Sequence, residues 1–300
     1  MVTAILWGTT GTAATFAPDV GPLAIGAAAL GVGGLLQGLI AIPDLHRHHI
    51  ALRQQTRLIL IGALGVFIYP LVFYSSMHLA GVAVGTVVSL GSAPIASGVM
   101  EWLIDSRRPT HRWMAAAVLG IGGSAVLCVA KMSDAPDGMA GTIGGVGLGL
   151  VAGVTYALYS WSAYQMMSRG IGRAAAMGSI FGLGGLALVP VLLITGAPLL
   201  ASAQNFAVGA YMALVPMFIG YVLFGYGLSK VSPSTATTIT LAEPALAAVL
   251  AVVIVGERLP MFGWLGLFAI ALSLVVLTTA TKTTSSRSEV VPLGLPHETH

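Results

Sequence analysis

The chain has 300 residues, of which 56% are hydrophobic and only 8% are charged, and its formal net charge is +3. Soluble domains carry about 25% charged residues, so this composition excludes an ordinary soluble domain and predicts an integral membrane protein. The apolar runs are long and unbroken rather than short and alternating, which favours membrane-spanning helices over a β-barrel. Neither the small net charge nor its distribution indicates a nucleic-acid partner.

Apolar runs separated by Pro, Asp and other polar residues predict an all-α integral membrane protein with ten transmembrane helices. The predicted spans are 2–17, 21–42, 57–78, 82–104, 112–131, 141–167, 173–196, 205–228, 233–255 and 260–281. Residues 282–300 are polar and are expected to form a disordered cytoplasmic tail.

The basic residues predict the orientation of these spans. With the N-terminus inside, 11 of the 13 Lys and Arg residues lie on the cytoplasmic side, and only Lys131 and Arg258 lie outside. Cytoplasmic loops of membrane proteins are enriched in Lys and Arg, so both termini are expected in the cytoplasm.

Similar landmarks occur twice along the chain. The stretch from Ser89 to Pro94 resembles Thr240 to Pro244, and a tryptophan follows each, at Trp113 and at Trp264. The repeat predicts a first unit over residues 1–131 and a second over 132–281, each with five spans. Because five is odd, the second unit enters the membrane from the opposite side, which is the pattern of a transporter with inverted repeats.

Helix breakers and polar aromatic residues recur at matched places in the two units. Pro70, Pro94 and Pro244 are expected to kink their helices and to expose backbone carbonyl groups that a substrate or an ion can use. The alternative for Tyr and Trp side chains is a place in the aromatic belt at the membrane surface. A stripe of glycines at Gly145, Gly149 and Gly153 predicts close helix packing, whether static or sliding.

Glu243 is a carboxylate at the predicted mid-depth of a span, directly before a proline. A charge at the bilayer centre costs about 2.5–3.5 kcal/mol on insertion scales. Glu243 is therefore expected to face a cavity as a proton-coupling or amine-binding group, or to be a neutral carboxyl bonded to carbonyls that Pro244 frees. Ala93 holds the corresponding place in the first unit. Glu101 poses the same question nearer the cytoplasmic end.

The order and spacing of these features resemble the drug/metabolite transporter superfamily, and more narrowly its EamA-type exporters, which include bacterial amino-acid exporters. The resemblance rests on Trp7-Gly8-Thr9, on Pro94 and Pro244, and on Gly256-Glu257-Arg258, and it covers residues 2–281. It implies a central cavity and alternating access by rocking of helix bundles. Carried over to this chain, the candidate substrate-binding residues are Trp7, Thr10, Tyr74, His78, Ser89, Tyr159, Trp161, Tyr221 and Glu243. The alternative for His78 is an ordinary structural histidine.

The sequence therefore predicts a bacterial inner-membrane secondary transporter that exports amino acids or similar small metabolites as a monomer. Its partners are the substrate, the lipid bilayer and protons as a candidate coupling ion. The alternative within transport is a multidrug or cationic-metabolite exporter in which Glu243 is the counter-charge. No catalytic motif, metal-ligand set or cofactor motif stands out, so neither an enzyme nor a metal or cofactor site is expected.

Overall fold

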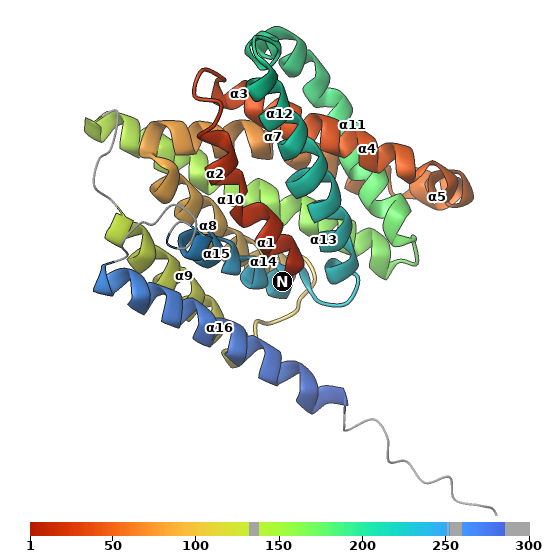
Figure 1. Ribbon diagram of the computed structural model, residues 1–300. Helices are drawn as coiled ribbons and strands as arrows, with labels where there is room; N and C mark the ends of the chain where they lie inside the picture. Colours follow the sequence, from red (N-terminus) through yellow and green to blue (C-terminus); the bar gives the residue numbers. More distant parts are fainter. Residues whose placement is uncertain (132–137, 251, 253–259, 286–300) are drawn as a thin grey trace, which may run out of the picture.

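The computed structural model describes residues 1–131, 138–250, 252 and 260–285 (Figure 1). Over these residues the regular secondary structure is entirely helical. The helices of the first part are α1 (Val2–Gly8), α2 (Thr10–Ala14), α3 (Pro22–Gly26), η1 (Ala27–Val32), α4 (Gly33–Ile40), α5 (Ile42–Arg47), α6 (His49–Gln54), α7 (Thr56–Ala80), α8 (Val82–Leu103) and α9 (His111–Lys131).

The helices of the second part begin with a long one. They are α10 (Gly138–Ser168), α11 (Arg173–Thr195), η2 (Ala197–Leu200), α12 (Ala203–Met212), η3 (Ala213–Ile219), α13 (Gly220–Leu228), α14 (Pro233–Thr240), α15 (Ala242–Leu250) and α16 (Met261–Ser285). The segments η1 and η3 are π-helical and each continues directly into the α-helices on either side of it. The end of the repeat around Glu257 and the tail from residue 286 lie outside the described residues.

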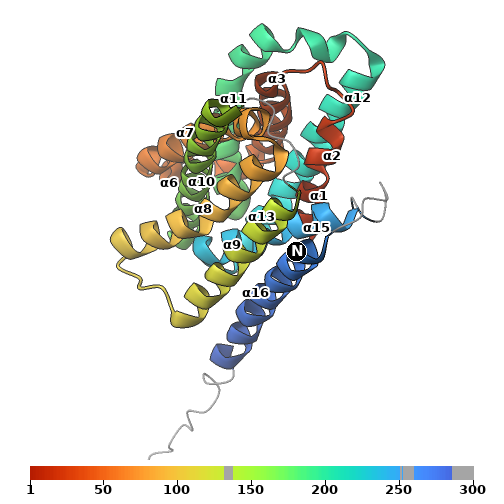
Figure 2. The same cartoon turned by 90° about the vertical axis from the view of Figure 1, so that its left-hand side faces the viewer.

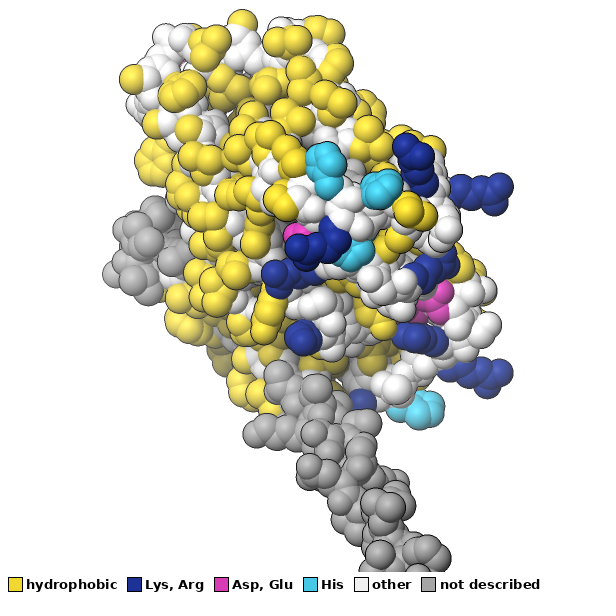
Figure 3. Space-filling model, turned by 90° about the vertical axis from the view of Figure 1, so that its right-hand side faces the viewer, with side chains coloured by type: hydrophobic (Ala, Val, Ile, Leu, Met, Phe, Trp, Pro, Cys, Tyr) yellow, Lys and Arg dark blue, Asp and Glu magenta, His cyan; other side chains and the backbone are white. Residues whose placement is uncertain are grey.

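Five helical stretches are long and apolar enough to cross a membrane. They are Pro22–Ile40, Thr56–Ala80, Ala140–Ser168, Arg173–Thr195 and Ala203–Leu228, and a shorter apolar stretch covers Met261–Leu277. Large apolar side chains remain exposed on outer faces, for example Leu193 at 79%, Ile194 at 82% and Phe268 at 69%. In the view of Figure 3 the Lys and Arg side chains gather at one region of a surface that is otherwise largely apolar. These properties are those of a protein that crosses the bilayer several times.

The predicted kink positions differ in their settings. Pro70 lies inside α7 and Pro94 lies inside α8, and both helices continue past the proline. Pro244 instead lies in the first turn of α15, after a break at Leu241 that separates α14 from α15. A proline at position 244 has no N–H to donate to the carbonyl of Thr240, which is why the helix is interrupted at this point.

Several helices of the first part of the chain pack against helices of the second part. Helix α7 packs on α10, α8 packs on both α10 and α14, and α4 packs on α11. Helix α1 packs on α13 and on α15. The pair α9 and α16 lies side by side at one edge of the bundle, as both views show (Figures 1 and 2).

Glycines on one face of α10 allow α7 and α8 to approach closely. A methyl group added at Gly145 would lie 2.7 Å from the backbone nitrogen of Ala80 and 3.0 Å from the carbonyl oxygen of Ser76. The hydroxyl of Ser76 donates a hydrogen bond of 2.6 Å to the carbonyl of Gly145 across the same contact. The glycine stripe therefore packs helix against helix, as small residues do in lipid.

Replacing Gly145 with Ala should lower stability, because the added methyl meets backbone atoms of α7 that cannot rotate away. Overpacking of this kind costs about 1–3 kcal/mol. The matched control is Gly147→Ala in the same helix, where nothing lies within 4 Å of the added methyl. Thermal unfolding in detergent should show a lower midpoint for Gly145→Ala, and an unchanged or higher one for Gly147→Ala, because Ala is the better helix former. Equal midpoints would contradict the close contact.

Candidate functional site

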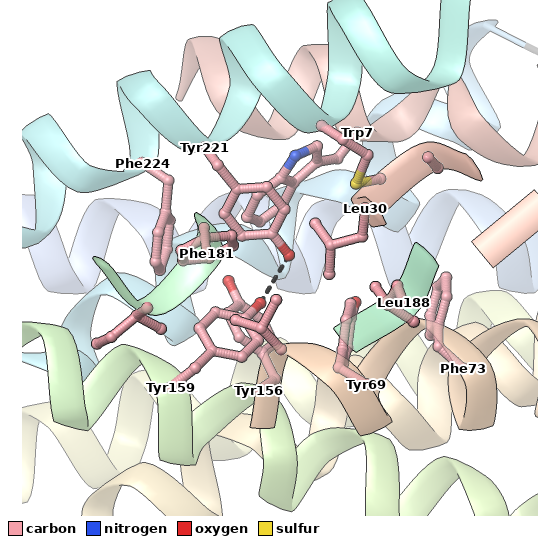
Figure 4. Close-up of a cluster of buried hydrophobic side chains, with 14 of the residues drawn as sticks. Trp7, Leu30, Tyr69, Phe73, Tyr156, Tyr159, Phe181, Leu188, Tyr221 and Phe224 are labelled. Carbon is pink, nitrogen blue, oxygen red and sulfur yellow. Dashed lines mark hydrogen bonds between the residues drawn. The ribbon is translucent and has the colours of Figure 1, made fainter. Parts of the chain in front are cut away.

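A cluster of buried aromatic rings occupies the middle of the bundle (Figure 4). Trp7 of α1 packs against Tyr221 of α13 with ring centroids 4.7 Å apart, and Phe181 of α11 approaches the same tyrosine at 4.6 Å. On α10, Tyr156 and Tyr159 are stacked at 5.3 Å. The cluster thus brings together helices that are far apart in the sequence.

Three polar contacts tie this cluster together. The hydroxyl groups of Tyr159 and Tyr221 share a hydrogen bond of 2.7 Å, drawn as the dashed line in Figure 4. The indole N–H of Trp7 donates to the carbonyl of Pro216 at 2.9 Å. The hydroxyl of Tyr156 bonds that of Thr240 at 3.0 Å, next to the break between α14 and α15. Buried Tyr and Trp side chains need such partners. Here the bond of Trp7 joins α1 to η3, and the bonds of the two tyrosines join α10 to α13 and to α14.

A small cavity lies against the aromatic cluster. Its lining residues are Trp7, Thr10, Leu30, Tyr69, Pro70, Phe73, Tyr74, Met217, Tyr221 and Glu243. The free space among them is about 10 Å³, which is room for roughly one water molecule. A substrate larger than water therefore requires the lining helices to separate.

Glu243 supplies the ionisable group of this cavity. Glu243 is 6% exposed, and among the described residues no group donates a hydrogen bond to it and no cation pairs with it. The hydroxyl of Tyr74, on the same wall, is also buried without a partner in the described part of the chain. A buried carboxyl group without a cation is costly only in its charged form, and a positive group placed beside Glu243 would give that form a partner.

The described interior offers no cation of its own. Its buried charged side chains are Glu101 and Glu243, and every Lys, Arg and His that the structure describes lies outside the buried set. A deprotonated Glu243 would therefore make the cavity favourable for a positive group, and the surrounding ring faces act in the same direction.

The structure brings together six of the nine side chains that the sequence analysis selected. Trp7, Thr10, Tyr74, Tyr221 and Glu243 line the cavity, and Tyr159 reaches it through its bond to Tyr221. The sequence analysis missed Leu30, Tyr69, Phe73 and Met217, which also line it. Tyr69 and Phe73 were recognisable as aromatic neighbours of Pro70, but nothing in the uniformly apolar helix marked which of its faces is inward.

The other three selected residues lie elsewhere. His78 is exposed near the C-terminal end of α7. Ser89 is buried in α8, where its hydroxyl has no partner among the described residues, and it does not line the cavity. The indole N–H of Trp161 donates to Oδ2 of Asp105 at 3.0 Å, so this side chain belongs to a second polar cluster.

This second cluster closes one end of the bundle, and we call it the acidic clasp. It consists of Glu101, Asp105, Trp161, Gln165 and Ser234. Oε1 of Glu101 accepts the backbone N–H of Ser234 at 2.7 Å, and Oε2 accepts its hydroxyl at 2.8 Å. Oδ1 of Asp105 accepts Nε2 of Gln165 at 2.6 Å. The clasp therefore joins the end of α8 to the start of α14 and to α10, with a carboxylate at the positive end of a helix.

Comparison with known proteins gives consistent results. The model of the EamA-like transporter family matches residues 1–129 and 143–279. The uncharacterized transporter YwfM of Bacillus subtilis is 32% identical over 283 residues, 93% of this chain and 92% of that protein. A probable terminal-alkyne amino-acid exporter of Streptantibioticus cattleyicolor is 26% identical over 69% of this chain and 67% of that protein. One crystal structure with 20% identity shares the fold, with a TM-score of 0.75 over 94% of this chain and 96% of that chain.

The clasp predicts energetic coupling between Glu101 and Ser234. Glu101→Gln and Ser234→Ala should each destabilise the protein, and the double variant should lose less than their sum, by about 1 kcal/mol. Unfolding of all four proteins in mixed micelles measures this coupling. The control is Ser229→Ala, whose hydroxyl bonds only the carbonyl of Tyr226 in its own turn, so it should add to Glu101→Gln without coupling. Additivity for Ser234 as well would contradict the clasp.

Proposed function

Because the chain belongs to the EamA-like transporter family, we propose that it exports small amine-bearing metabolites, amino acids above all, across the bacterial inner membrane. The observation that carries this proposal is the unpaired carboxylate of Glu243 in a cavity lined by aromatic rings. An ammonium group placed there would pair with Glu243 and lie against ring faces, which attract cations. Such a contact would relieve the cost of the buried charge.

The carboxylate end of an amino acid finds weaker partners in this site. Tyr74 lines the cavity and its hydroxyl has no partner among the described residues, and the hydrogen-bonded hydroxyls of Tyr159 and Tyr221 keep one proton between them that is free to donate. These groups can donate hydrogen bonds to a carboxylate without a formal positive charge. The name of the Streptantibioticus relative, a probable terminal-alkyne amino-acid exporter, supports a substrate of this kind.

The transporter works, in our proposal, as ten spans in two inverted five-helix repeats, residues 1–131 and 132–281. Two observations support this. The family model matches the chain twice, over residues 1–129 and 143–279. The helix contacts also correspond. If the two repeats exchange places, the contact of α7 with α10 becomes a contact of α13 with α1, and α13 does pack on α1. The same exchange turns the pair of α9 and α16 into itself. Inverted repeats place the binding site at their shared interface, where Glu243 and Trp7 lie.

The size of the cavity supports alternating access as part of this proposal. The free space of about 10 Å³ admits no amino acid, so substrate entry requires the aromatic cluster to open. The acidic clasp lies at the end of the bundle that carries Arg107 and Arg169, which the distribution of basic residues assigns to the cytoplasm. An exporter loads from that side, so the bonds of Glu101 and Asp105 are those that we expect to break during loading.

Proton exchange is the simplest coupling for this site. A single carboxylate can hold a proton or pair with an ammonium ion, but not both at once. A proton that arrives from the outside would therefore displace the amine there, and its release to the cytoplasm would make Glu243 available again.

Export of cationic drugs or cationic metabolites is the second candidate. It is favoured by the absence of any buried Lys, Arg or His among the described residues, since a substrate without a carboxylate would need none. Glu243 would then be the counter-charge of the substrate.

The test is transport by purified protein in liposomes, with radiolabelled amino acids and with a cationic dye, in the presence and absence of a pH gradient. We expect saturable amino-acid transport that the gradient stimulates, and a loss of at least about tenfold in Glu243→Gln, as for removal of one charge-paired contact. Asp19→Asn, which removes an exposed acid that does not line the cavity, is the control and should transport normally.

Each other outcome points elsewhere. Amino-acid transport that Glu243→Gln leaves intact would remove Glu243 from the site. Transport of the dye alone, lost in Glu243→Gln, would replace the lead proposal with the second candidate. No transport of either probe above empty vesicles would contradict both.

A further inference from the structure

A second hollow, which we call the arginine pocket, lies on the surface where α6 meets α7. Its lining residues are Arg53, Gln54, Gln55, Thr56, Arg57, Leu58 and Arg169, and its volume is about 450 Å³. Three arginines thus line one space. The pocket is separate from the cavity around Glu243, since the two have no lining residue in common.

No acidic side chain in the described part of the chain balances the positive charge of the arginine pocket. The ion pair found among the described residues joins Arg47 to Asp44 at 3.6 Å. Neither of these two residues lines the arginine pocket. Arg169 donates to the side-chain oxygen of Gln55, which is a neutral acceptor. No Asp or Glu lines the pocket. Guanidinium groups in this state are suited to an anion with several oxygens, because each can bind phosphate with two parallel hydrogen bonds.

The arginine pocket lies where apolar spans begin. Thr56 is the first residue of one candidate span, and Arg173, four residues after Arg169, is the first residue of another. Arg57, Leu60, Ile61 and Leu64 follow one another on a single face of α7, and the three apolar side chains are 55%, 39% and 53% exposed. An arginine at the head of an exposed apolar stripe matches a lipid, with a polar head group above its acyl chains.

We propose that the arginine pocket binds the phosphate head group of an anionic phospholipid. Arg53 and Arg57 hold it from α6 and α7, and Arg169 holds it from the turn between α10 and α11. The acyl chains lie along Leu60, Ile61 and Leu64. The lipid thereby links two parts of the bundle that the protein itself joins here through Gln55 and Arg169. Basic pockets between membrane helices are known to bind anionic head groups in this way.

The experiment compares the wild type with Arg53→Gln/Arg57→Gln/Arg169→Gln. The control is Arg47→Gln/Arg108→Gln/Arg112→Gln, which removes the same charge at exposed positions outside the pocket. Native mass spectrometry in detergent measures binding of added phosphatidylglycerol and phosphatidylcholine. Thermal unfolding in nanodiscs of phosphatidylcholine, with and without an equal part of phosphatidylglycerol, measures the stabilisation.

We expect the wild type and the control to bind phosphatidylglycerol in preference to phosphatidylcholine and to be stabilised by it. The pocket variant should bind phosphatidylglycerol at least about tenfold more weakly and lose most of the stabilisation. If the triple variant does not fold, Arg57→Gln alone, at an exposed position, should show a smaller loss of the same kind. The variant with three lysines should keep part of the binding, because it keeps the charge but not the paired hydrogen bonds.

Three results would overturn the proposal. Equal losses in the pocket and control variants would mean a general attraction of basic residues to the membrane surface. Equal binding of the two lipids by the wild type would mean that the head-group charge is not recognised. Stabilisation by soluble inorganic phosphate in phosphatidylcholine nanodiscs, equal to that by phosphatidylglycerol, would mean a site for a free anion rather than for a lipid.

Discussion

Close packing of α10 against its neighbours is the contact on which the rest of the structure depends. In lipid, apolar helices gain little from leaving their surroundings, so they associate through van der Waals contact and hydrogen bonds at small residues. The glycine face of α10 provides this contact with α7 and α8, and Ser76 adds a hydrogen bond. The same helix then carries Tyr156 and Tyr159 to the aromatic cluster and Trp161 and Gln165 to the acidic clasp. The depth to which α10 settles therefore sets the geometry of both polar clusters at once.

The two buried glutamates show how identical side chains acquire different roles. Both carboxylate oxygens of Glu101 accept hydrogen bonds from Ser234 at the start of α14, so this side chain holds two helices together. Glu243 has no such donor among the described residues and lies beside ring faces and a water-sized space. A satisfied carboxylate stabilises one arrangement of helices, whereas an unsatisfied one is poised for a ligand. In our proposal the bonds of Glu101 break while the substrate is loaded, and Glu243 pairs with the amine of that substrate.

The family, the all-helical character and the buried place of Glu243 beside a cavity could be predicted from the sequence, because a lone acid in an apolar run is conspicuous. The inward faces of the helices could not, since these helices are apolar on all sides and have no clear polar stripe. Tyr159 and Trp161 illustrate the limit. Two positions along a helix turn the side chain by about 200°, so the two residues cannot face one cavity. Tyr74 and His78 share a face, but one further turn carries His78 to the exposed end of α7. The helical period tells which side chains share a face, but it tells which face points inward only once a neighbour of the helix is known.

The bond between Trp7 and Pro216 has a consequence for how the chain can vary. The acceptor is the carbonyl of a residue within the π-helical segment η3, so it belongs to the main chain and not to any side chain. No substitution at position 216 deletes that oxygen, although one can shift it by reshaping the segment. Position 7, in contrast, supplies the only donor of the pair through its ring N–H. Substitution of position 7 is therefore constrained by this bond, whereas substitution of position 216 is comparatively free. A survey of tolerated substitutions would thus detect Trp7 but not the residue that accepts its hydrogen bond.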